Sequence, residues 1–311
     1  MAGGALIREL RREDCPAVAS VHLTVNPHQL ETPGRVWFWA TRGIEREQWR
    51  HWVAEANGEI VGSAWAAFEW SVPTAGKGRF WVAVPPERRR RGIGGALYGV
   101  VEEYLREHGA WRARTQVDAD PAGERFLEQR GYERCEADRV SELVLASAEL
   151  PEPSVPVVPL ARARHLERDL YEICAAGEID MPGDEPETAL TLETWRLDDY
   201  GLPDLSADGS FVAFDGERAV ALAFLCLDPE RRLAYNQMTA TLPSHRRRGL
   251  ALAVKLASAR WARENVYERL LTENDESNTG MLAINERLGY RPLYDQVSFV
   301  RQWERPPGER R

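Results

Sequence analysis

Long apolar segments are absent from this sequence. The longest uncharged apolar run, residues 219–227, is far shorter than the roughly 20 residues that a membrane-spanning helix needs. Residues 1–12 contain no basic region followed by an apolar stretch, so they do not resemble a secretion signal. We therefore expect no membrane partner and a cytoplasmic location.

The sequence also has few cysteines and no excess of basic residues. The four cysteines, Cys15, Cys135, Cys174 and Cys226, stand singly without paired spacing, so neither a zinc site nor a disulfide framework is indicated. The 40 Lys and Arg are outnumbered by 49 Asp and Glu, giving a net charge of -9, which argues against a broad nucleic-acid-binding face. We expect no metal and no nucleic-acid partner, and the oligomeric state is open.

What the sequence does contain is a repeat. Residues 89–94 read RRRGIG, and residues 246–251, at an offset of 157, read RRRGLA. Two further matches occur at an offset of 158, NGE at 57–59 with DGE at 215–217 and RGY at 130–132 with LGY at 288–290. Three correspondences at nearly one offset indicate duplication, and 311 residues are enough for two domains.

A proline-rich segment separates the two copies. Residues 148–156 read AELPEPSVP, and prolines lack the backbone N–H group that helices and central strands use. We therefore divide the chain into an N-terminal domain, residues 1–150, and a C-terminal domain, residues 151–311.

Each copy predicts alternating strands and helices. Asn57-Gly58 between two apolar runs indicates a hairpin, so the sheet is mixed rather than wholly parallel. The fold class is therefore α/β, with a mixed central sheet flanked by helices in each domain. Strands are expected at residues 6–10, 53–55, 60–68, 111–117, 139–145, 211–214, 219–227, 233–241, 269–272 and 297–302, and a further strand ends at residue 84. Helices are expected at residues 93–108, 124–130, 250–263 and 278–288, and a further helix begins at residue 14.

The arginine and glycine loop in each copy is suited to binding an anion. It lies between a predicted strand and a predicted helix, where backbone N–H groups are unpaired at the positive end of the helix dipole. Glycines allow close approach to a diphosphate, and arginines can bind its outer oxygens. The Walker pattern is missing, and Leu97 and Ala251 replace glycines that a dinucleotide fingerprint requires.

The two loops resemble the coenzyme A diphosphate loop of the GNAT superfamily of acyl-CoA-dependent N-acyltransferases, whose core is Arg/Gln-x-x-Gly-x-Gly/Ala. The resemblance covers both copies and implies two tandem GNAT domains that use acetyl-CoA. It assigns the diphosphate to the backbone of both loops and the pantetheine arm to the strand before each. The implied cofactor-binding residues are Val82, Val84, Arg89, Arg90, Arg91, Gly92, Ile93 and Gly94, and Thr239, Thr241, Arg246, Arg247, Arg248, Gly249, Leu250 and Ala251.

A second family signature is preserved only in the C-terminal copy. Asn278 stands eleven residues before Gly289, which is the position of the family's pantetheine-contacting asparagine, whereas the N-terminal copy has Asp120 there. The family's usual general acid, a tyrosine four residues before the glycine, is Leu127 in the first copy and Asn285 in the second. The acid could lie elsewhere, or the thiolate, with an ordinary thiol pKa of about 8.5, could leave without one.

The C-terminal copy is therefore the better candidate for catalysis. Glu273 and Asn274 follow a predicted strand beside the expected thioester and are candidates for handling the amine, although Asn274 could merely cap the following helix. Tyr235 and Tyr294 could donate a proton, or could be core tyrosines with satisfied hydroxyl groups. An amine with a lysine-like pKa of about 10.4 needs a base at neutral pH, whereas an α-amine with a pKa of about 7.8 could need only a water relay. The sequence does not decide between these two kinds of acceptor.

Charge gives a hint about the acceptor. Residues 1–150 contain 20 Lys and Arg against 22 Asp and Glu, whereas residues 151–311 contain 20 against 27. The segment 178–208 is acidic, and Arg196 is its only basic residue. An acidic segment of this kind would attract a cationic amine if it lined the acceptor site. Alternatively, the segment is simply a solvated part of the surface. The corresponding segment of the first copy is aromatic; it contains Trp37, Phe38, Trp39, Trp49 and Trp52. These side chains could stack on a ligand, although we expect them to cover the apolar sheet and the other domain.

These observations predict an acyltransferase, namely an N-acetyltransferase. It would move an acetyl group from acetyl-CoA to a primary amine of a small cationic molecule by direct attack in a ternary complex, with the C-terminal copy catalytic. Two alternatives are open. Catalysis could lie in the N-terminal copy, whose loop has the fuller Gly-x-Gly form, with the C-terminal copy binding substrate. The missing tyrosines also allow a non-catalytic acyl-CoA sensor or scaffold.

Overall fold

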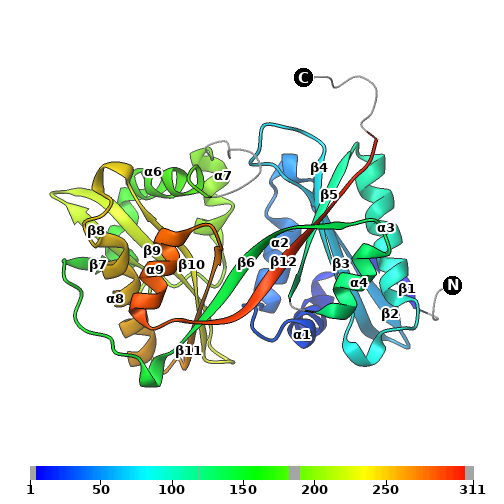
Figure 1. Cartoon of the computed structure of the whole chain (residues 1–311), viewed down its shortest axis with the longest axis horizontal. Coiled ribbons are helices and arrows are strands. Elements are labelled where there is room, and N and C mark those ends of the chain that lie inside the picture. The colour runs from blue at the N-terminus through cyan, green and yellow to red at the C-terminus, as the bar shows by residue number, and fades with distance from the viewer. Residues whose placement is uncertain (1–4, 119, 182–189, 305–311) are drawn as a thin grey trace. The chain divides into compact units, whose positions relative to one another are not determined.

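The computed structural model describes residues 5–118, 120–181 and 190–304. The chain forms two compact units, of which unit 1 comprises residues 1–137 and 296–311, and unit 2 comprises residues 138–295. Figure 1 shows the helices and strands coloured in chain order. Among the helices of the described residues, none combines the length and the apolar character that crossing a membrane demands.

Unit 1 is a mixed sheet with helices on both faces (Figure 1). Its strands are antiparallel except for β4 and β5. Helices α3 and α4 share one apolar core with the sheet, whereas α1 and α2 pack on the other face. The strands are β1 (Leu6–Glu9), β2 (Arg50–Ala56), β3 (Glu59–Phe68), β4 (Lys77–Ala83), β5 (Arg112–Asp118) and part of β12 (Arg291–Gln302), and the helices are α1 (Cys15–Val25), α2 (Pro33–Thr41), α3 (Ile93–Glu107) and α4 (Pro121–Glu128).

Unit 2 repeats this arrangement. Its only parallel pair among the described strands is β10 with β11. Helix α8 forms a core with one face of the sheet, and α6 packs on β9 and β10. The strands are part of β6 (Glu133–Val144), β7 (Val157–Pro159), β8 (Phe211–Asp215), β9 (Arg218–Asp228), β10 (Leu233–Thr241) and β11 (Arg269–Asp275), and the helices are α5 (Leu160–Ala163), α6 (Glu167–Glu178), α7 (Leu192–Arg196), α8 (Leu250–Glu264) and α9 (Thr279–Leu288).

The two units exchange their last strands. Residues 138–144 of β6, from the first sequence copy, pair antiparallel with β11 of unit 2. Residues 296–302 of β12, from the second copy, pair with β5 of unit 1 and bury Val297 and Phe299 in its core. The compact units therefore differ from a division at residues 150 and 151, because each copy gives one strand to the sheet of the other unit.

The predicted fold class is confirmed, since each unit is a mixed sheet flanked by helices. The Asn57-Gly58 turn joins β2 and β3 as expected, with φ of 53° at Asn57 and 80° at Gly58. Helices α2, α5, α6 and α7 and strand β7 were not predicted from the sequence. Of these, α2 and α7 lie in the segments that were read only for their aromatic and acidic content.

Candidate functional site

The two loops adopt the same backbone conformation. A 3₁₀ turn, Pro86–Arg88 in unit 1 and Pro243–His245 in unit 2, precedes each arginine run. Arg90 and Arg247 then have φ of 63° and 60°, and Gly92 and Gly249 have φ of 82° and 79°. Helices α3 and α8 begin at the next residue. A left-handed residue immediately before each helix favours glycine because it lacks a Cβ atom.

Two arginines in each loop brace the loop itself. The Nε atom of Arg89 donates to the carbonyl oxygen of Val84 at 3.0 Å, and that of Arg246 donates to Thr241 at 3.1 Å. Arg91 and Arg248 each donate from Nη2 to a carbonyl four residues earlier, at 3.3 Å in both cases. The duplicated arginines thus hold each loop against the end of its strand, β4 or β10.

The middle arginine and the helix start are what each loop offers to an anion. Arg90 and Arg247 are exposed and have no hydrogen bond or ion pair with any residue that the structure describes. Gly92 and Gly249, the N-cap residues, give α3 and α8 no side-chain cap. The first N–H groups of both helices therefore lie uncapped at a positive helix end beside a cation, and this donor set fits a diphosphate.

The hydrophobic residues of the loops anchor the helices. Ile93 and Leu250, each the first residue of its helix, are buried at 4% and 8% exposure. A Cβ atom at Gly94 would lie 3.7 Å from both Phe126 and Val84, which is an ordinary contact. Alanine is therefore sterically acceptable at this position, and Ala251 occupies it in unit 2.

In both units the parallel strand pair separates after three residues. Strand β4 pairs with β5 only as far as Arg79 and Arg114, and β10 pairs with β11 only as far as Tyr235 and Leu271. We call the point of separation the fork. Beyond it, β4 runs on to Ala83 and β10 to Thr241, so one edge of each strand loses its strand partner.

The predicted pantetheine-contacting residues lie on these separated segments. Val82 and Val84 stand at the end of β4 and just after it, and Thr239 and Thr241 stand at the end of β10. Unpaired backbone N–H and C=O groups require hydrogen-bonding partners, and the amides of an extended ligand can supply them as an added strand does. The two strand edges therefore suit an amide-containing chain that leads away from the loop.

Strand β10 carries a bulge that β4 lacks. Its register with β9 shifts by one residue between Asn236 and Met238, whereas β4 pairs with β3 without a shift. The extra residue, Gln237, donates from Nε2 to Asp199 Oδ1 at 3.2 Å. Bulges re-aim side chains and occur beside active sites, so the two forks differ in shape just beyond their last paired residues.

Two of the four predicted catalytic residues meet at the fork of unit 2. Tyr235 is the last paired residue of β10, and Glu273 lies two residues beyond Leu271 on β11. The Tyr235 hydroxyl donates to Glu273 Oε2 at 3.3 Å. Both side chains are half-buried. A carboxylate held in this way can accept a proton from an amine that approaches the fork.

The other two predicted catalytic residues have different surroundings. Asn274 Oδ1 accepts from Nδ2 of Asn285 at 2.7 Å, so Asn274 does not cap α9. The cap is Asn278, whose Oδ1 accepts from the backbone N–H group of Met281 at 3.2 Å. Tyr294 lies half-buried on β12. The bond between Asn274 and Asn285 was not foreseen, because only the folded chain brings β11 and α9 together.

Unit 1 has an ion pair where unit 2 has its asparagine. Asp120 caps α4 by accepting from Ala122 N at 3.0 Å, and its Oδ2 lies 2.8 Å from Nη1 of Arg89. Asp120 thus occupies the same capping position as Asn278, and in addition it forms an ion pair with Arg89 of the loop that follows β4. The position of the family's tyrosine is apolar in unit 1, where Leu127 is buried in the core.

The acidic segment is described only in part, since Asp184, Glu185 and Glu187 lie outside the described residues. Asp180 forms an ion pair with Arg246 of the loop. Asp199 accepts the hydrogen bond from Gln237 in the bulge. The described part of this segment therefore contacts both the loop and the strand that lead to the fork of unit 2.

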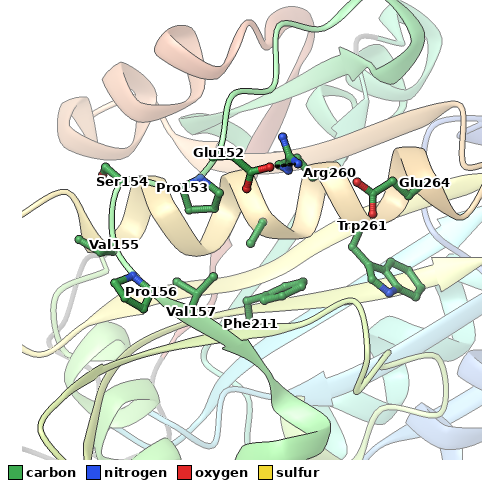
Figure 2. A pocket seen from close by; sticks show the side chains of 11 residues that line it. Glu152, Pro153, Ser154, Val155, Pro156, Val157, Phe211, Arg260, Trp261 and Glu264 are labelled. Atoms are coloured by element: carbon green, nitrogen blue, oxygen red, sulfur yellow. Dashed lines mark hydrogen bonds and ion pairs between the residues drawn. The ribbon is translucent and has the colours of Figure 1, made fainter.

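A pocket of about 570 Å³ in unit 2 lies apart from these features (Figure 2). It is bounded by the linker residues 152–157, by Phe211 of β8 and by α8, and its described lining contains no loop, fork or predicted catalytic residue. Arg260 of α8 holds the linker, since its Nη1 donates to Leu150 O at 2.8 Å and its Nη2 pairs with Glu152. The pocket is a space between α8 and the chain packed against it.

Comparison with known proteins identifies the repeat. The profile of the Acetyltransferase (GNAT) family matches residues 5–132 and again residues 168–290. The chain is similar to a solved tandem GNAT protein from the clavulanic acid biosynthesis pathway, without AcCoA, with 19% identity, coverage of 96% of this chain and 98% of that one, and a TM-score of 0.71. A GCN5-related N-acetyltransferase from Sphaerobacter thermophilus has 18% identity, coverage of 97% and 96%, and a TM-score of 0.69. No curated protein matches the sequence.

Proposed function

Because the chain belongs to the GNAT family of acetyltransferases, which transfer acyl groups from acyl-CoA, we propose that it is an N-acetyltransferase with catalysis in unit 2. The proposed reaction moves the acetyl group of acetyl-CoA to a primary amine of a small cationic molecule, by direct attack in a ternary complex. The observation that carries this proposal is the bond between Tyr235 and Glu273 at the fork of unit 2.

The loop and the fork divide the work. Arg247 and the uncapped N–H groups of α8 would hold the diphosphate, and the separated edge of β10 would hold the pantetheine arm. Asn278, at the start of α9, stands at the family's pantetheine-contacting position. Acetyl-CoA, when bound, supplies the thioester that is attacked. This assignment leaves the acceptor side of the fork to Tyr235 and Glu273.

Glu273 is proposed to act as the general base. An amine of lysine-like pKa, about 10.4, is almost wholly protonated at neutral pH, so it must lose a proton before it attacks. The Glu273 carboxylate would accept that proton, and Tyr235 orients the carboxylate through Oε2. The same negative charge favours a cationic acceptor, as does the acidic segment that contacts the bulge.

The fork of unit 1 does not offer this chemistry. Its residues at the positions of Tyr235 and Glu273 are Arg79 and Gln116, as the strand registers show. An amide cannot take the proton of an ammonium group, and a guanidinium repels a cationic acceptor. Unit 1 nevertheless has a loop of the same conformation, so we propose that it binds acetyl-CoA without acetylating a cationic amine.

Calorimetric titration of acetyl-CoA into the full chain tests this division. We expect two sites per chain, because the two loops share their backbone conformation and their exposed middle arginine. Arg247→Glu and Arg90→Glu form a matched pair, since each reverses one exposed charge. Each variant is expected to lose one site, because glutamate repels the phosphate as well as removing the contact. Turnover should be at least about tenfold lower in Arg247→Glu than in Arg90→Glu, because the proposal places catalysis in unit 2.

The possible outcomes separate the alternatives. A larger loss of turnover in Arg90→Glu would place catalysis in unit 1 and contradict the proposal. Binding of acetyl-CoA without turnover across a broad panel of amines would favour an acyl-CoA sensor. Absence of any binding would overturn the assignment of both loops.

A further inference from the structure

The fork of unit 1 carries a positively charged side chain that is partly exposed. Arg79 is the last residue of β4 that pairs with β5, which is the place of Tyr235 in unit 2. Its side chain is 35% exposed, whereas its charge partner, Glu47, is 1% exposed. The end of the guanidinium group is therefore accessible while the carboxylate that holds it is not.

Arg79 shares its charge partner with a second arginine. Glu47 pairs with Nη2 of Arg79 and also with Arg42, whose side chain is 2% exposed and whose Nε donates to Glu47 Oε2 at 2.9 Å. One carboxylate is thus shared by two guanidinium groups, so Glu47 does not serve Arg79 alone. Burial of Glu47 reduces solvent screening of this pair, and the exposed end of Arg79 stays open to a second anion.

The guanidinium group is used only in part. Within the described residues, Nη2 has a carboxylate partner, Nε is buried without a hydrogen bond, and Nη1 has no bonded partner. A guanidinium presents its donors in a planar fork that matches a carboxylate. Arg79 therefore has donors left for a second, external carboxylate on the exposed side.

Indole rings surround this charge. The guanidinium carbon of Arg79 lies 6.0 Å from the ring centre of Trp49 and 5.9 Å from that of Trp65. Trp49 and Trp65 stack at 4.5 Å between ring centres. Trp81 of β4 lies opposite Trp65 of β3 and two residues after Arg79. The side chains of Arg79, Trp65 and Trp81 therefore share one face of the sheet. All three indoles are half-buried.

We propose that the fork of unit 1 binds a planar aromatic carboxylate. Its carboxylate group pairs with Nη1 of Arg79, and its ring lies against the indoles of Trp49, Trp65 and Trp81. An aromatic ring gains from offset or edge contacts with indoles, and the carboxylate gives Arg79 a second anionic partner beside the shared Glu47. The two forks thus have opposite preferences, with a carboxylate for cations in unit 2 and a guanidinium for anions in unit 1.

This inference does not depend on acetyl transfer by unit 2. Its residues all belong to unit 1, and its test measures binding rather than turnover. It also differs from binding at the loop, because Arg89 and Arg90 lie beyond the end of β4 while Arg79 lies at the fork, within that strand. Failure of the acetyltransferase proposal would leave it standing, and its own failure would leave that proposal standing.

Titration of the full chain with benzoate, followed by tryptophan fluorescence, tests the inference. Benzylamine and benzamide serve as matched probes of the same ring with a positive and a neutral substituent. We expect saturable quenching by benzoate, and at least about tenfold weaker binding of the other two. Arg79→Gln should weaken benzoate binding about tenfold or more, while Glu47 keeps its partner Arg42.

A second variant guards against a merely structural effect. Arg79→Lys keeps the charge that pairs with Glu47 but loses the planar donor fork, so benzoate binding should be intermediate between wild type and Arg79→Gln. Circular dichroism would establish that both variants are folded. Absence of saturable quenching by benzoate, equal quenching by benzylamine, or unchanged benzoate binding in folded Arg79→Gln would each overturn the proposal.

Discussion

Replacing Glu273 with glutamine is expected to lower kcat for a lysine-like amine roughly 10²- to 10⁴-fold, the usual contribution of a positioned general base. Glutamine keeps the shape of the side chain and can still bond to the Tyr235 hydroxyl, but it cannot accept the proton of an ammonium group. Binding of acetyl-CoA should be unchanged in calorimetry, because Glu273 lies at the fork and not at the loop.

The pH dependence of the variant gives a sharper signature. Without a base on the enzyme, only the neutral fraction of the amine reacts, and this fraction rises about tenfold per pH unit below an amine pKa of about 10.4. The rate of Glu273→Gln should therefore climb about tenfold per unit from pH 7 to 9, and that of the wild type should climb less steeply. Initial rates at saturating acetyl-CoA measure this difference.

Two further variants make the result specific. Glu276→Gln is the matched control, because Glu276 is a carboxylate three residues away that is exposed and pairs with Arg139; its rate should stay near that of the wild type. Tyr235→Phe removes the bond to Oε2 while keeping the base, so we expect a smaller loss than in Glu273→Gln. Activity of Glu273→Gln within about twofold of wild type at pH 7 would rule out Glu273 as the base.

The fold could largely be predicted because its signals are local. Hydrophobic periodicity, the Asn57-Gly58 turn and the glycines before α3 and α8 each depend on a few neighbouring residues. The exchange of β6 and β12 could not be predicted, because the apolar alternation of Val297 and Phe299 fits equally beside β5 or β11. A strand pattern specifies which face is buried, and it does not specify which neighbouring strand it pairs with.

The candidate site was predictable to a different degree in each part. The loop residues could be proposed from the sequence because the helix-end geometry that they need is encoded in one short motif. The pairing of Tyr235 with Glu273 requires the parallel register of β10 and β11, which joins residues 38 positions apart. Arg79 was not singled out, since its relation to Tyr235 becomes visible only when both are seen to be the last paired residues of their strands.

The two units also differ beneath their forks, where unit 1 is aromatic and unit 2 is polar. In unit 1, Phe80, Tyr98 and Tyr132 form a cluster in which Phe80 lies 5.8 and 5.6 Å from the other two rings. The corresponding residues of unit 2 are Asn236, Lys255 and Tyr290. Asn236 follows the last paired residue of β10, Lys255 is the sixth residue of α8 as Tyr98 is of α3, and Tyr290 follows Gly289 as Tyr132 follows Gly131. An exchange of this kind puts an amine into the interior of unit 2.

Lys255 is confined by its surroundings. Its side chain is 1% exposed, and its Nζ lies 5.2 Å from the ring centre of Tyr290. The Tyr290 hydroxyl donates to Asn236 Oδ1 at 2.8 Å, so it is already engaged. Burial disfavours the charged form of the amine and lowers the pKa of Lys255 from 10.5 to about 7. Above about pH 7, most folded chains therefore hold this amine in its neutral form, whereas the unfolded chain keeps the proton.

Replacing Lys255 with methionine is accordingly expected to stabilise the protein at pH 7. The unfolded chain binds the proton up to about pH 10.5, whereas the folded chain releases it at about pH 7, so the free energy of unfolding of the wild type rises with pH between these values. Each unit of pKa difference is worth about 1.4 kcal/mol. The pKa difference of 10.5 minus about 7 therefore gives an expected gain of about 3 to 5 kcal/mol for the variant at pH 7.

The pH dependence separates this effect from better packing. Methionine fills nearly the same volume at every pH, so an advantage due to packing would be constant, whereas the advantage due to the proton shrinks by about 1.4 kcal/mol per unit as the pH rises above 7. Urea denaturation of both proteins at about pH 7, 8 and 9 measures it. Leu256→Met, at the neighbouring buried position of α8, is the control and should show no pH-dependent difference from the wild type. A difference between Lys255→Met and wild type that stays constant over this range would show that Lys255 keeps its proton in the folded chain.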